Sequence, residues 1–370
     1  MSWHTLLSDN LNNADQLCDA FHLSAKEKER IQTELNQFPM SVPQYYFSLI
    51  DKDDPNDPIR KMAVPSGNII FQDGELDTSG EHSNTKLQGL QHKYAQTVLV
   101  LTTSNCAMYC RFCFRRRLVG LESEEIAQDI GAVVSYITQH PQISNVLLSG
   151  GDSFLMTTER IKQWLQELTA LDQLDFIRFG TRTPVTFPQR ILTDPELLQV
   201  LETYGKKKQL YVITHFNHPK EITDESTAAV KALQNAGLVV KNQTVLMRSI
   251  NDDPNVLATL LKKLTSIGVV PHYLFQCRPV KGVKSHFQVP LQEGYRITQD
   301  ALSLQNGLGK GIDYTMSHVT GKIRILSADE NGRMFCQYNQ AKNPKNIGRV
   351  FSLDIKPDQT WLPDQIELSY

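Results

Sequence analysis

The sequence predicts an α/β protein built around a partial (β/α)6 barrel, with a mostly helical region before it and a short segment after it. From about residue 97, short β-branched runs alternate with amphipathic helical stretches, which is typical of a parallel sheet with right-handed crossovers. Polar motifs directly follow several of the predicted strands, where barrel enzymes gather their active-site residues. Six strand–helix repeats favour a partial barrel over a closed eight-fold one, and a doubly wound sheet remains an alternative.

The elements follow in order along the chain. Residues 1–92 are expected to be mostly helical, with Ser24 capping a helix that begins at Ala25 and a loop at the proline-rich stretch 51–58. The barrel is expected over residues 93–305 and a C-terminal segment over 306–370. The predicted strands are 97–103, 145–149, 175–179, 209–214, 239–246 and 270–275, and the predicted helices are 122–139, 157–171, 193–204, 223–236, 254–266 and 290–304.

Composition excludes several classes of partner. The 370-residue chain has a formal net charge of −2, which gives no bulk attraction to nucleic acid or to a membrane surface. Apolar runs such as Val98–Leu101 are too short to cross a bilayer. The first residues, Met1–His4, do not resemble a signal peptide, so we expect a cytoplasmic protein.

The most informative motif is a set of three cysteines directly after the first predicted strand. Cys106, Cys110 and Cys113 have the spacing C-x3-C-x2-C. Three thiolates on one short loop can bind three irons of a cubane [4Fe–4S] cluster, which leaves the fourth iron open to a small molecule. We therefore predict that these cysteines are cluster ligands.

Zinc and disulfides are the alternatives for these cysteines. A structural zinc site usually takes four protein ligands, often as C-x2-C pairs. The other cysteines, Cys18, Cys277 and Cys336, lie singly and far apart in the sequence, which disfavours zinc. A disulfide framework is unexpected in a long chain whose start does not resemble a signal peptide.

Two further motifs carry polar chemistry. Asp152 follows Gly150 and Gly151 at the end of the second predicted strand, where the glycines allow close backbone approach and the carboxylate can bind an ammonium group. The alternative is an ordinary strand-to-helix turn. Arg115 belongs to an arginine run beside the cysteines, and an arginine fork binds carboxylate or phosphate in a bidentate way. A solvated charge run is the alternative, but the position beside the cysteines favours a binding role.

The histidines and lysines give weaker signals. His215 and His218 follow the fourth predicted strand, but no third ligand is obvious, so we predict no mononuclear metal site. Lys322 follows Gly321 late in the chain. A lysine in such a place can attach an aldehyde cofactor such as pyridoxal phosphate (PLP), although taken alone it is better explained as a surface lysine.

Taken together, these motifs resemble those of the radical S-adenosylmethionine (radical SAM) aminomutases of the lysine 2,3-aminomutase type. The resemblance extends from about Asp57 to about Lys322, which is most of the chain. It includes Asp57–Lys61, the cysteine run through Arg117, Leu147–Asp152, Thr181–Pro184, Pro188–Ile191, Thr214–Pro219, Glu221–Thr223 and Asn242–Leu246.

The resemblance implies a radical SAM barrel and three cofactors, namely a [4Fe–4S] cluster on the three cysteines, SAM and PLP. Lys322 would attach PLP, and Arg115 would bind the α-carboxylate of the substrate. The reaction implied is an isomerisation that moves the amino group of an L-α-amino acid from Cα to Cβ. The residues expected around SAM are Gly150, Gly151, Asp152, Thr181, His215 and Gln243, and those expected near the PLP phosphate are Lys93 and Tyr94.

The implied partners are a small amino-acid substrate and a one-electron reductase such as flavodoxin or ferredoxin. A homodimer also fits the resemblance. Neither nucleic acid nor a membrane is expected as a partner.

Departures from the family pattern concern the substrate and PLP. Lysine-specific members hold the distal ammonium with two aspartates, whereas this chain has Arg278 at the first position and Thr315 near the second. An arginine would repel that ammonium and could pair with a carboxylate, so a glutamate-like substrate is favoured over free lysine. Thr97 stands where relatives often carry an arginine for the PLP phosphate, and Ser317–Gly321 replaces a glycine run. These two departures leave the retention of PLP open.

Three alternatives to this function remain. One is a lysine 2,3-aminomutase, including one with a role linked to elongation factor P, and Arg278 disfavours it. Another is a radical SAM enzyme that does not use PLP. The third is a non-catalytic iron–sulfur or zinc interaction protein, which would not cleave SAM.

Overall fold

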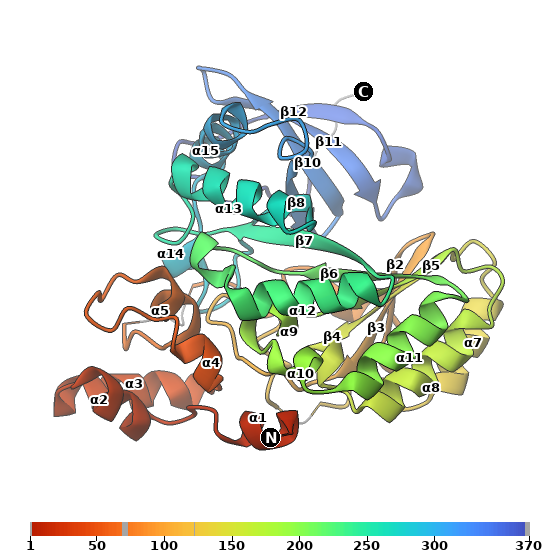
Figure 1. Cartoon of the computed structure of the whole chain (residues 1–370). Coiled ribbons are helices and arrows are strands. Elements are labelled where there is room, and N and C mark those ends of the chain that lie inside the picture. Colours follow the sequence, from red (N-terminus) through yellow and green to blue (C-terminus); the bar gives the residue numbers. More distant parts are fainter. Residues whose placement is uncertain (1, 69–72, 122, 367–370) are drawn as a thin grey trace. The chain divides into compact units, whose positions relative to one another are not determined.

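The computed structural model describes residues 2–68, 73–121 and 123–366 of the chain (Figure 1). They fall into two compact units. The first contains residues 1–69, 83–215 and 220–241, and the second contains residues 70–82, 216–219 and 242–370. Along the chain, the six strands β3 to β8 are separated by helices, so the mixed α/β prediction is confirmed and the order of elements agrees with a partial barrel. The three-part division at residues 92 and 305 stays a prediction.

Four parallel strands form the centre of the first unit, and they pair in chain order. Their C-terminal ends therefore lie along one edge of the sheet. Two antiparallel strands that the sequence did not predict, β1 (Thr85–Leu87) and β2 (Leu90–Tyr94), extend the sheet beside β3. The parallel strands agree with the predicted ones within one residue: β3 (Thr97–Thr103), β4 (Asn145–Gly150), β5 (Phe176–Gly180) and β6 (Gln209–Thr214).

Amphipathic helices follow these strands, and Figure 1 shows α7, α8 and α11 side by side. Their buried residues recur at helical spacing, as Ile161, Leu165 and Leu168 do in α8. The longer helices of this part are α7 (Ile130–Thr138), α8 (Thr158–Thr169), α11 (Pro195–Gly205) and α12 (Asp224–Asn235). The shorter ones are α9 (Thr183–Thr186), α10 (Gln189–Leu192) and the 3-10 turns η1 (Ser153–Leu155) and η2 (Pro219–Glu221).

The helix predicted over 122–139 is too long. Residue 122 lies outside the described residues, and residues 123–129 are not helical. The helix begins at Ile130 because the Asp129 side chain accepts a hydrogen bond from the Ala132 amide and caps it there.

The described part of the N-terminal region contains several short helices joined by loops. Ser24 caps α3 through a capping box: its hydroxyl accepts from the Glu27 amide, and the Glu27 carboxylate accepts from the Ser24 amide at 2.8 Å. Asp57 ends the 51–58 loop by capping the next helix, which begins at Pro58. The helices are α1 (Trp3–Ser8), α2 (Ala14–Phe21), α3 (Ala25–Gln37), α4 (Gln44–Phe47), α5 (Pro58–Ala63) and α6 (Glu81–Asn84).

The second unit contains a mixed sheet in which β8 and β9 are parallel and the later strands are antiparallel. The strands after β8 were not predicted individually. Strand β7 (Val239–Leu246) leads from the first unit into the second. The strands of this sheet are β8 (Val270–Gln276), β9 (Asp313–His318), β10 (Gly321–Ala328), β11 (Arg333–Ala341) and β12 (Val350–Asp354). Its helices are α13 (Pro254–Ser266), α14 (Lys284–Phe287), α15 (Leu291–Ser303) and the 3-10 turn η3 (Pro344–Asn346).

One face of β8, β9 and β10 forms the core of the second unit together with α13 and α15. Leu274, Tyr314, Met316 and Ile323 are all buried in this core. Because side chains alternate along a strand, the residues between them project from the opposite face of the sheet. Charged and aromatic side chains lie on that opposite face.

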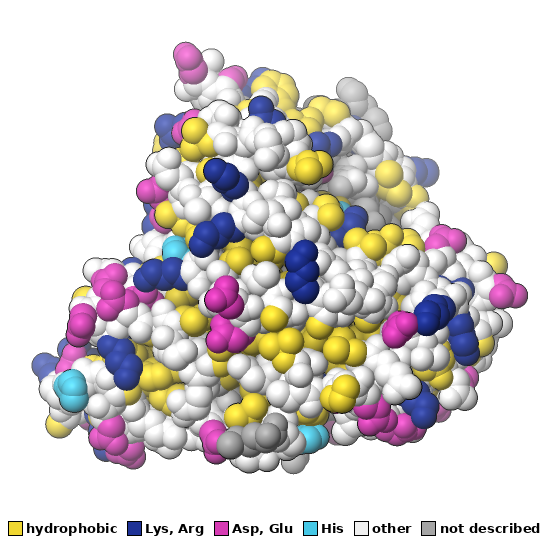
Figure 2. Space-filling model, in the orientation of Figure 1, with side chains coloured by type: hydrophobic (Ala, Val, Ile, Leu, Met, Phe, Trp, Pro, Cys, Tyr) yellow, Lys and Arg dark blue, Asp and Glu magenta, His cyan; other side chains and the backbone are white. Residues whose placement is uncertain are grey.

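The visible surface agrees with the near-neutral composition. Figure 2 shows basic and acidic side chains interspersed over the displayed face. None of the helices in the described ranges has the length and apolar character that a membrane span requires.

We expect the Ser24→Ala substitution to loosen α3, because it removes one half of the capping box. Loss of such a cap costs about 1 kcal/mol, which corresponds to roughly five-fold faster amide exchange if the helix opens locally. Hydrogen exchange measured by mass spectrometry over residues 25–37 tests this. The exposed Thr33→Ala variant in the same helix is the control, and equal exchange in the two variants would contradict the role of the cap.

Candidate active site

The cysteine loop follows β3 and is anchored by the N-terminal region of the first unit. The Tyr109 amide donates to the Ser41 carbonyl at 2.9 Å, and the Arg111 amide donates to the Met62 carbonyl at 2.9 Å. The Asn10 side-chain amide donates to the Ala107 carbonyl at 2.8 Å. Backbone groups of the loop are thus satisfied by residues far away in the sequence, which fixes the loop without using the thiols.

Buried ion pairing strengthens the same anchor. The Arg111 guanidinium forms an ion pair with Glu34, which α3 presents, and both side chains are almost fully buried. Removing either partner would leave a buried charge without compensation, which is strongly destabilising. The cysteine loop and α3 therefore depend on each other.

The three predicted cluster ligands are free, partly buried thiols. Burial raises the pKa of Cys113 to about 12 and raises that of Cys110, although the Arg182 cation opposes the second shift. The pKa of Cys106 is raised well above its ordinary value by burial and then by Asp152 and the other two thiols. The three groups are therefore close enough to interact electrostatically.

The thiols fit an iron–sulfur cluster by type and location. Within residues 2–68, 73–121 and 123–366, no three His, Cys, Asp or Glu side chains are arranged to hold a metal ion as they stand. Metal binding deprotonates cysteine outright, so raised pKa values of the free thiols are compatible with ligation. Cluster ligation by these cysteines stays a prediction.

Gly150 and Gly151 let the end of β4 pack against the cysteine loop. The Gly151 amide donates to the Thr103 carbonyl at 2.6 Å, and the next amide, that of Asp152, donates to the Asn105 carbonyl at 2.8 Å. A Cβ atom at Gly151 would lie 2.3 Å from the Asn105 carbonyl oxygen. Close approach of two backbone segments explains why glycine is needed here, whether or not a ligand is bound.

Asp152 ties the end of β4 to the end of β5. One carboxylate oxygen accepts from the Phe154 amide at 3.0 Å and from the Thr181 hydroxyl at 2.5 Å. The other oxygen accepts from the Arg182 amide at 2.7 Å. Burial raises the pKa of Asp152, and these donors oppose the shift. A carboxylate offers about four acceptor positions, so one remains for the predicted ammonium group.

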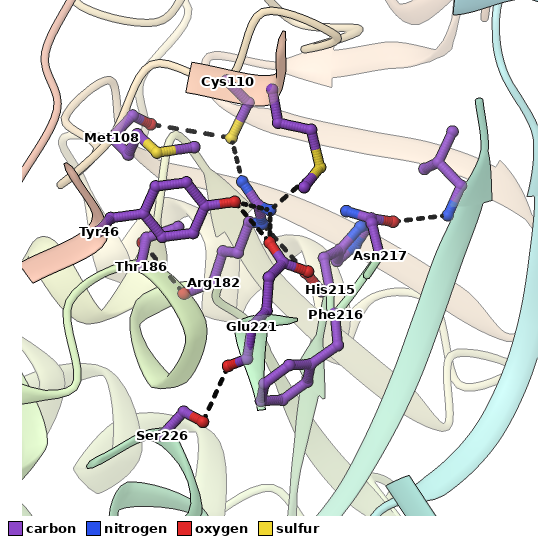
Figure 3. Close-up of polar contacts among 12 residues, drawn as sticks. Tyr46, Met108, Cys110, Arg182, Thr186, His215, Phe216, Asn217, Glu221 and Ser226 are labelled. Atoms are coloured by element: carbon purple, nitrogen blue, oxygen red, sulfur yellow. Dashed lines mark hydrogen bonds and ion pairs between the residues drawn. The ribbon is translucent and has the colours of Figure 1, made fainter. Parts of the chain in front are cut away.

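Arg182 is the residue that sequence reasoning missed. It stands between two threonines of a motif that directed attention to Thr181 alone. Figure 3 shows its guanidinium among Cys110, Tyr46 and Glu221. It donates to the Cys110 sulfur at 2.9 Å and forms an ion pair with Glu221, whose side chain is fully buried. Burial alone would lower the pKa of Arg182, but Cys110, Tyr46 and Glu221 outweigh it and raise the pKa.

His215 lies at the end of β6 and is held neutral at ordinary pH. Burial and then the Arg182 cation lower its pKa to about 4. Its carbonyl accepts a hydrogen bond from Arg182 Nε at 3.0 Å. The ends of β4, β5 and β6 thus meet through Asp152, Arg182 and His215. The predicted role of Asp152, Thr181 and His215 around SAM stays a prediction.

Arg115 is buried and already hydrogen-bonded. Its Nη1 donates to the Ser149 hydroxyl at 3.0 Å, and its guanidinium lies 4.8 Å from the centroid of the Phe114 ring. The arginine is thus no solvated surface charge, as the sequence predicts. Its predicted role with the substrate carboxylate stays a prediction.

The residues expected near the PLP phosphate lie on neighbouring strands of the first unit. Lys93 and Tyr94 end β2, where the lysine amine lies 5.7 Å from the centroid of the tyrosine ring. Thr97 begins β3 and exchanges hydrogen bonds with the Asn145 side chain. Phosphate binding at Lys93 and Tyr94 stays a prediction.

Lys322 lies on the non-core face of the sheet in the second unit. It is the cross-strand partner of Ser317, so both side chains leave the same face. The Lys322 amine lies 4.3 Å from the ring centroid of Tyr273 and 5.7 Å from that of Phe275. The lysine is half-buried against aromatic rings, which fits an attachment site for a planar aldehyde cofactor and differs from an isolated surface lysine.

The two predicted specificity residues belong to the same unit. Arg278 follows the end of β8 and donates from Nη2 to the Ser317 hydroxyl at 2.8 Å, which brings it next to the strand position opposite Lys322. Thr315 shares this face as the partner of Phe275 but is fully buried. Gln243 is half-buried in β7.

Two buried asparagines that sequence reasoning missed hold the histidine-containing motif after β6. The Phe216 amide donates to Asn242 Oδ1 at 2.7 Å, and Asn242 Nδ2 returns a bond to the Phe216 carbonyl at 3.0 Å. Asn217, which Figure 3 also draws, accepts from the Val245 amide at 2.8 Å. The only signal in the sequence was an asparagine in the connection before β7, Asn217, and another within β7, Asn242.

The fold and the cysteine motif define a radical SAM protein. The model of the Radical SAM superfamily matches residues 100–261. A protein of Aquifex aeolicus (strain VF5), provisionally named an L-lysine 2,3-aminomutase, is 38% identical over 93% of this chain and 92% of its own. The L-lysine 2,3-aminomutase of Clostridium subterminale is 38% identical over 80% of this chain and 71% of its own. The glutamate 2,3-aminomutase of Clostridioides difficile (strain 630) is 37% identical over 82% of this chain and 71% of its own.

The chain therefore belongs to the lysine 2,3-aminomutase family of radical SAM enzymes, and it is an isomerase. The family uses a [4Fe–4S] cluster, SAM and PLP, as the sequence predicts.

We expect Gly151→Ala to force the cysteine loop away from β4, because the new methyl group would overlap the Asn105 carbonyl. Such overpacking costs about 1–3 kcal/mol. The expected result is a lower midpoint of thermal unfolding and less iron bound per chain after anaerobic reconstitution. Gly307→Ala is the control, since nothing lies within 4 Å of the added carbon. A Gly151→Ala protein as stable as this control would contradict the packing argument.

Proposed function

We propose that this enzyme is a PLP-dependent 2,3-aminomutase that acts on a free L-α-amino acid with an acidic side chain, glutamate first. The main support for this proposal is the hydrogen bond from Arg278 to Ser317, because Ser317 is the cross-strand partner of Lys322. Through this contact, the Arg278 cation lies close to the lysine that would attach PLP.

Cys106, Cys110 and Cys113 would hold the cluster, and Lys322 would hold PLP. When bound, the cluster and SAM supply an organic radical that abstracts hydrogen, and PLP supplies the electron delocalisation that amino-group migration needs. The chain itself would orient these groups. The Asp152 carboxylate and the neutral His215 ring would border SAM, and Arg115 would bind the α-carboxylate of the substrate.

The charge balance around Arg278 supports an acidic substrate. On the face that carries Lys322, the carboxylate of Asp313 is already paired with Arg324. The Arg278 cation would repel the distal ammonium of lysine, whereas a distal carboxylate could pair with it.

Free lysine is the second candidate, because several relatives carry that name. The relatives from Clostridium subterminale and Fusobacterium nucleatum are each 38% identical and are called L-lysine 2,3-aminomutases. A role linked to elongation factor P belongs to this candidate. An electron donor such as flavodoxin or ferredoxin, a homodimer and a cytoplasmic location are further parts of the proposal.

The substrate proposal is tested with Arg278→Gln and Arg278→Asp. Loss of a charge-paired hydrogen bond costs about 2–5 kcal/mol, so kcat/KM for glutamate should fall by about 30-fold or more in Arg278→Gln. Arg278→Asp should raise the preference for lysine relative to glutamate. Mass spectrometry of β-amino isomers formed by the anaerobic, reconstituted enzyme gives both values.

Arg333→Gln is the control, since it removes an exposed arginine of the same sheet that lies on β11 and donates to the Ser352 hydroxyl. An unchanged glutamate-to-lysine ratio in Arg278→Asp would refute the acidic substrate. SAM cleavage without any β-isomer from a panel of free amino acids would indicate an unusual or macromolecular substrate. Absence of SAM cleavage would favour the non-catalytic alternative.

Lys322→Ala should abolish the absorbance of enzyme-bound PLP and leave the iron content unchanged. The reason is that the cysteine ligands lie on a different loop of the chain. Ultraviolet–visible spectra of the reconstituted protein and an iron assay check both halves. Unchanged PLP absorbance would exclude Lys322 as the attachment site, and wild-type protein that binds no PLP would favour the alternative enzyme that does without it.

A further inference from the structure

A guanidinium group touches one of the three predicted cluster ligands. Arg182 Nη1 donates to the Cys110 sulfur at 2.9 Å (Figure 3). We propose that Arg182 is a positioning residue that raises the reduction potential of the cluster through this hydrogen bond and through its positive charge. The proposal rests on the cluster that the proposed function assigns to Cys106, Cys110 and Cys113.

The position of Arg182 is fixed from several sides. Its Nε donates to the His215 carbonyl at 3.0 Å, and its backbone amide donates to Asp152 at 2.7 Å. Its Nη2 forms the ion pair with Glu221 and also lies 3.3 Å from the Tyr46 hydroxyl. A planar fork held at Nε and Nη2 has little freedom left, so Nη1 is directed at the sulfur in advance.

The partners of Arg182 are themselves anchored. The Tyr46 hydroxyl donates to the Glu221 carboxylate at 2.6 Å. The Glu221 carbonyl accepts from the Ser226 hydroxyl at 2.9 Å at the start of α12. The arginine is therefore supported by the N-terminal region through Tyr46 and by the β6–α12 connection through Glu221.

The expected effect follows from the charge of the cluster. Reduction adds one electron, so a nearby fixed cation stabilises the reduced state more than the oxidised one. Hydrogen bonds to cluster sulfurs and the local charge are the protein's main means of setting such potentials. Since the Arg182 side chain is only 10% exposed, solvent ions screen this effect little. The guanidinium contacts the sulfur, whereas the Glu221 carboxylate contacts the guanidinium, so the positive group is the nearer of the two charges.

The decisive measurement is the midpoint potential of the cluster in the full chain without SAM. An anaerobic titration with dithionite and mediators, followed by electron paramagnetic resonance, gives this value. One electron enters the cluster, no bond to Arg182 forms or breaks, and the guanidinium keeps its protons. A purely structural arginine would leave the potential of any assembled cluster unchanged.

The main variant is the double substitution Arg182→Met with Glu221→Gln, which removes both charges of a buried pair and leaves neither unpaired. We expect the ratio of oxidised to reduced cluster at a given potential to rise about ten-fold or more. For a one-electron couple this is a fall of about 59 mV. Arg182→Lys retains the charge but not the fork, and a smaller fall is expected.

The matched control is Arg190→Met with Asp194→Asn. This is another buried arginine–carboxylate pair of the first unit, and Arg190 contacts Asp194, Thr158, the Trp3 ring and carbonyls of the β4–α8 connection. Its ratio should stay within about two-fold of the wild-type value, because a two-fold change is small beside the ten-fold effect predicted above.

The outcomes separate the two proposals. Wild-type protein that assembles no cluster would overturn the proposed function and this inference together. A cluster with the wild-type potential in the double variant would overturn this inference alone. If the double variant binds no iron, Arg182→Lys decides the matter, and an unchanged potential in that variant refutes the role.

Discussion

The candidate site in the first unit depends on one buried carboxylate. Asp152 accepts hydrogen bonds from three donors that belong to the ends of β4 and β5, and its own amide bonds to the cysteine loop after β3. An ionised carboxylate is costly to bury unless such donors surround it. Because these donors come from separate loops, the carboxylate makes the geometry of each loop depend on the others. The two glycines before Asp152 are the steric condition for this arrangement.

The N-terminal region is part of the site rather than an appendage. Its residues Asn10, Ser41 and Met62 bond the backbone of the cysteine loop, Glu34 pairs with Arg111, and Tyr46 supports the Arg182 network. The sequence predicts helices here but gives no reason to connect them with the cysteines, because the contacts join positions up to 175 residues apart. Ion pairs and hydrogen bonds between such distant positions leave no local pattern in a sequence.

Much of the fold could be predicted because its signals are local. The six strands β3 to β8 and five of the six long helices follow from β-branched runs, helical periodicity and capping residues. The sequence prediction began α7 too early, because the helical pattern extends to residues before Asp129. The helix itself begins only after the Asp129 cap. The sheet β9–β12 was missed because its residues alternate between a buried core face and a polar face, without the strand–helix rhythm that guided the earlier assignments. In the site, type and spacing singled out Cys110 and Thr181, whereas the role of Arg182 needed coordinates, since arginine between threonines has no distinctive pattern.

Successive side chains of β9 alternate between the core and the face that carries Lys322. Tyr314 and Met316 lie in the core, whereas Asp313, Thr315 and Ser317 leave the strand toward the face that carries Lys322. A mutation at one of these three positions can alter the chemistry of that face without removing a core side chain. Substitutions at these three positions can therefore change the substrate during evolution, while Lys322 and the core packing behind it stay the same.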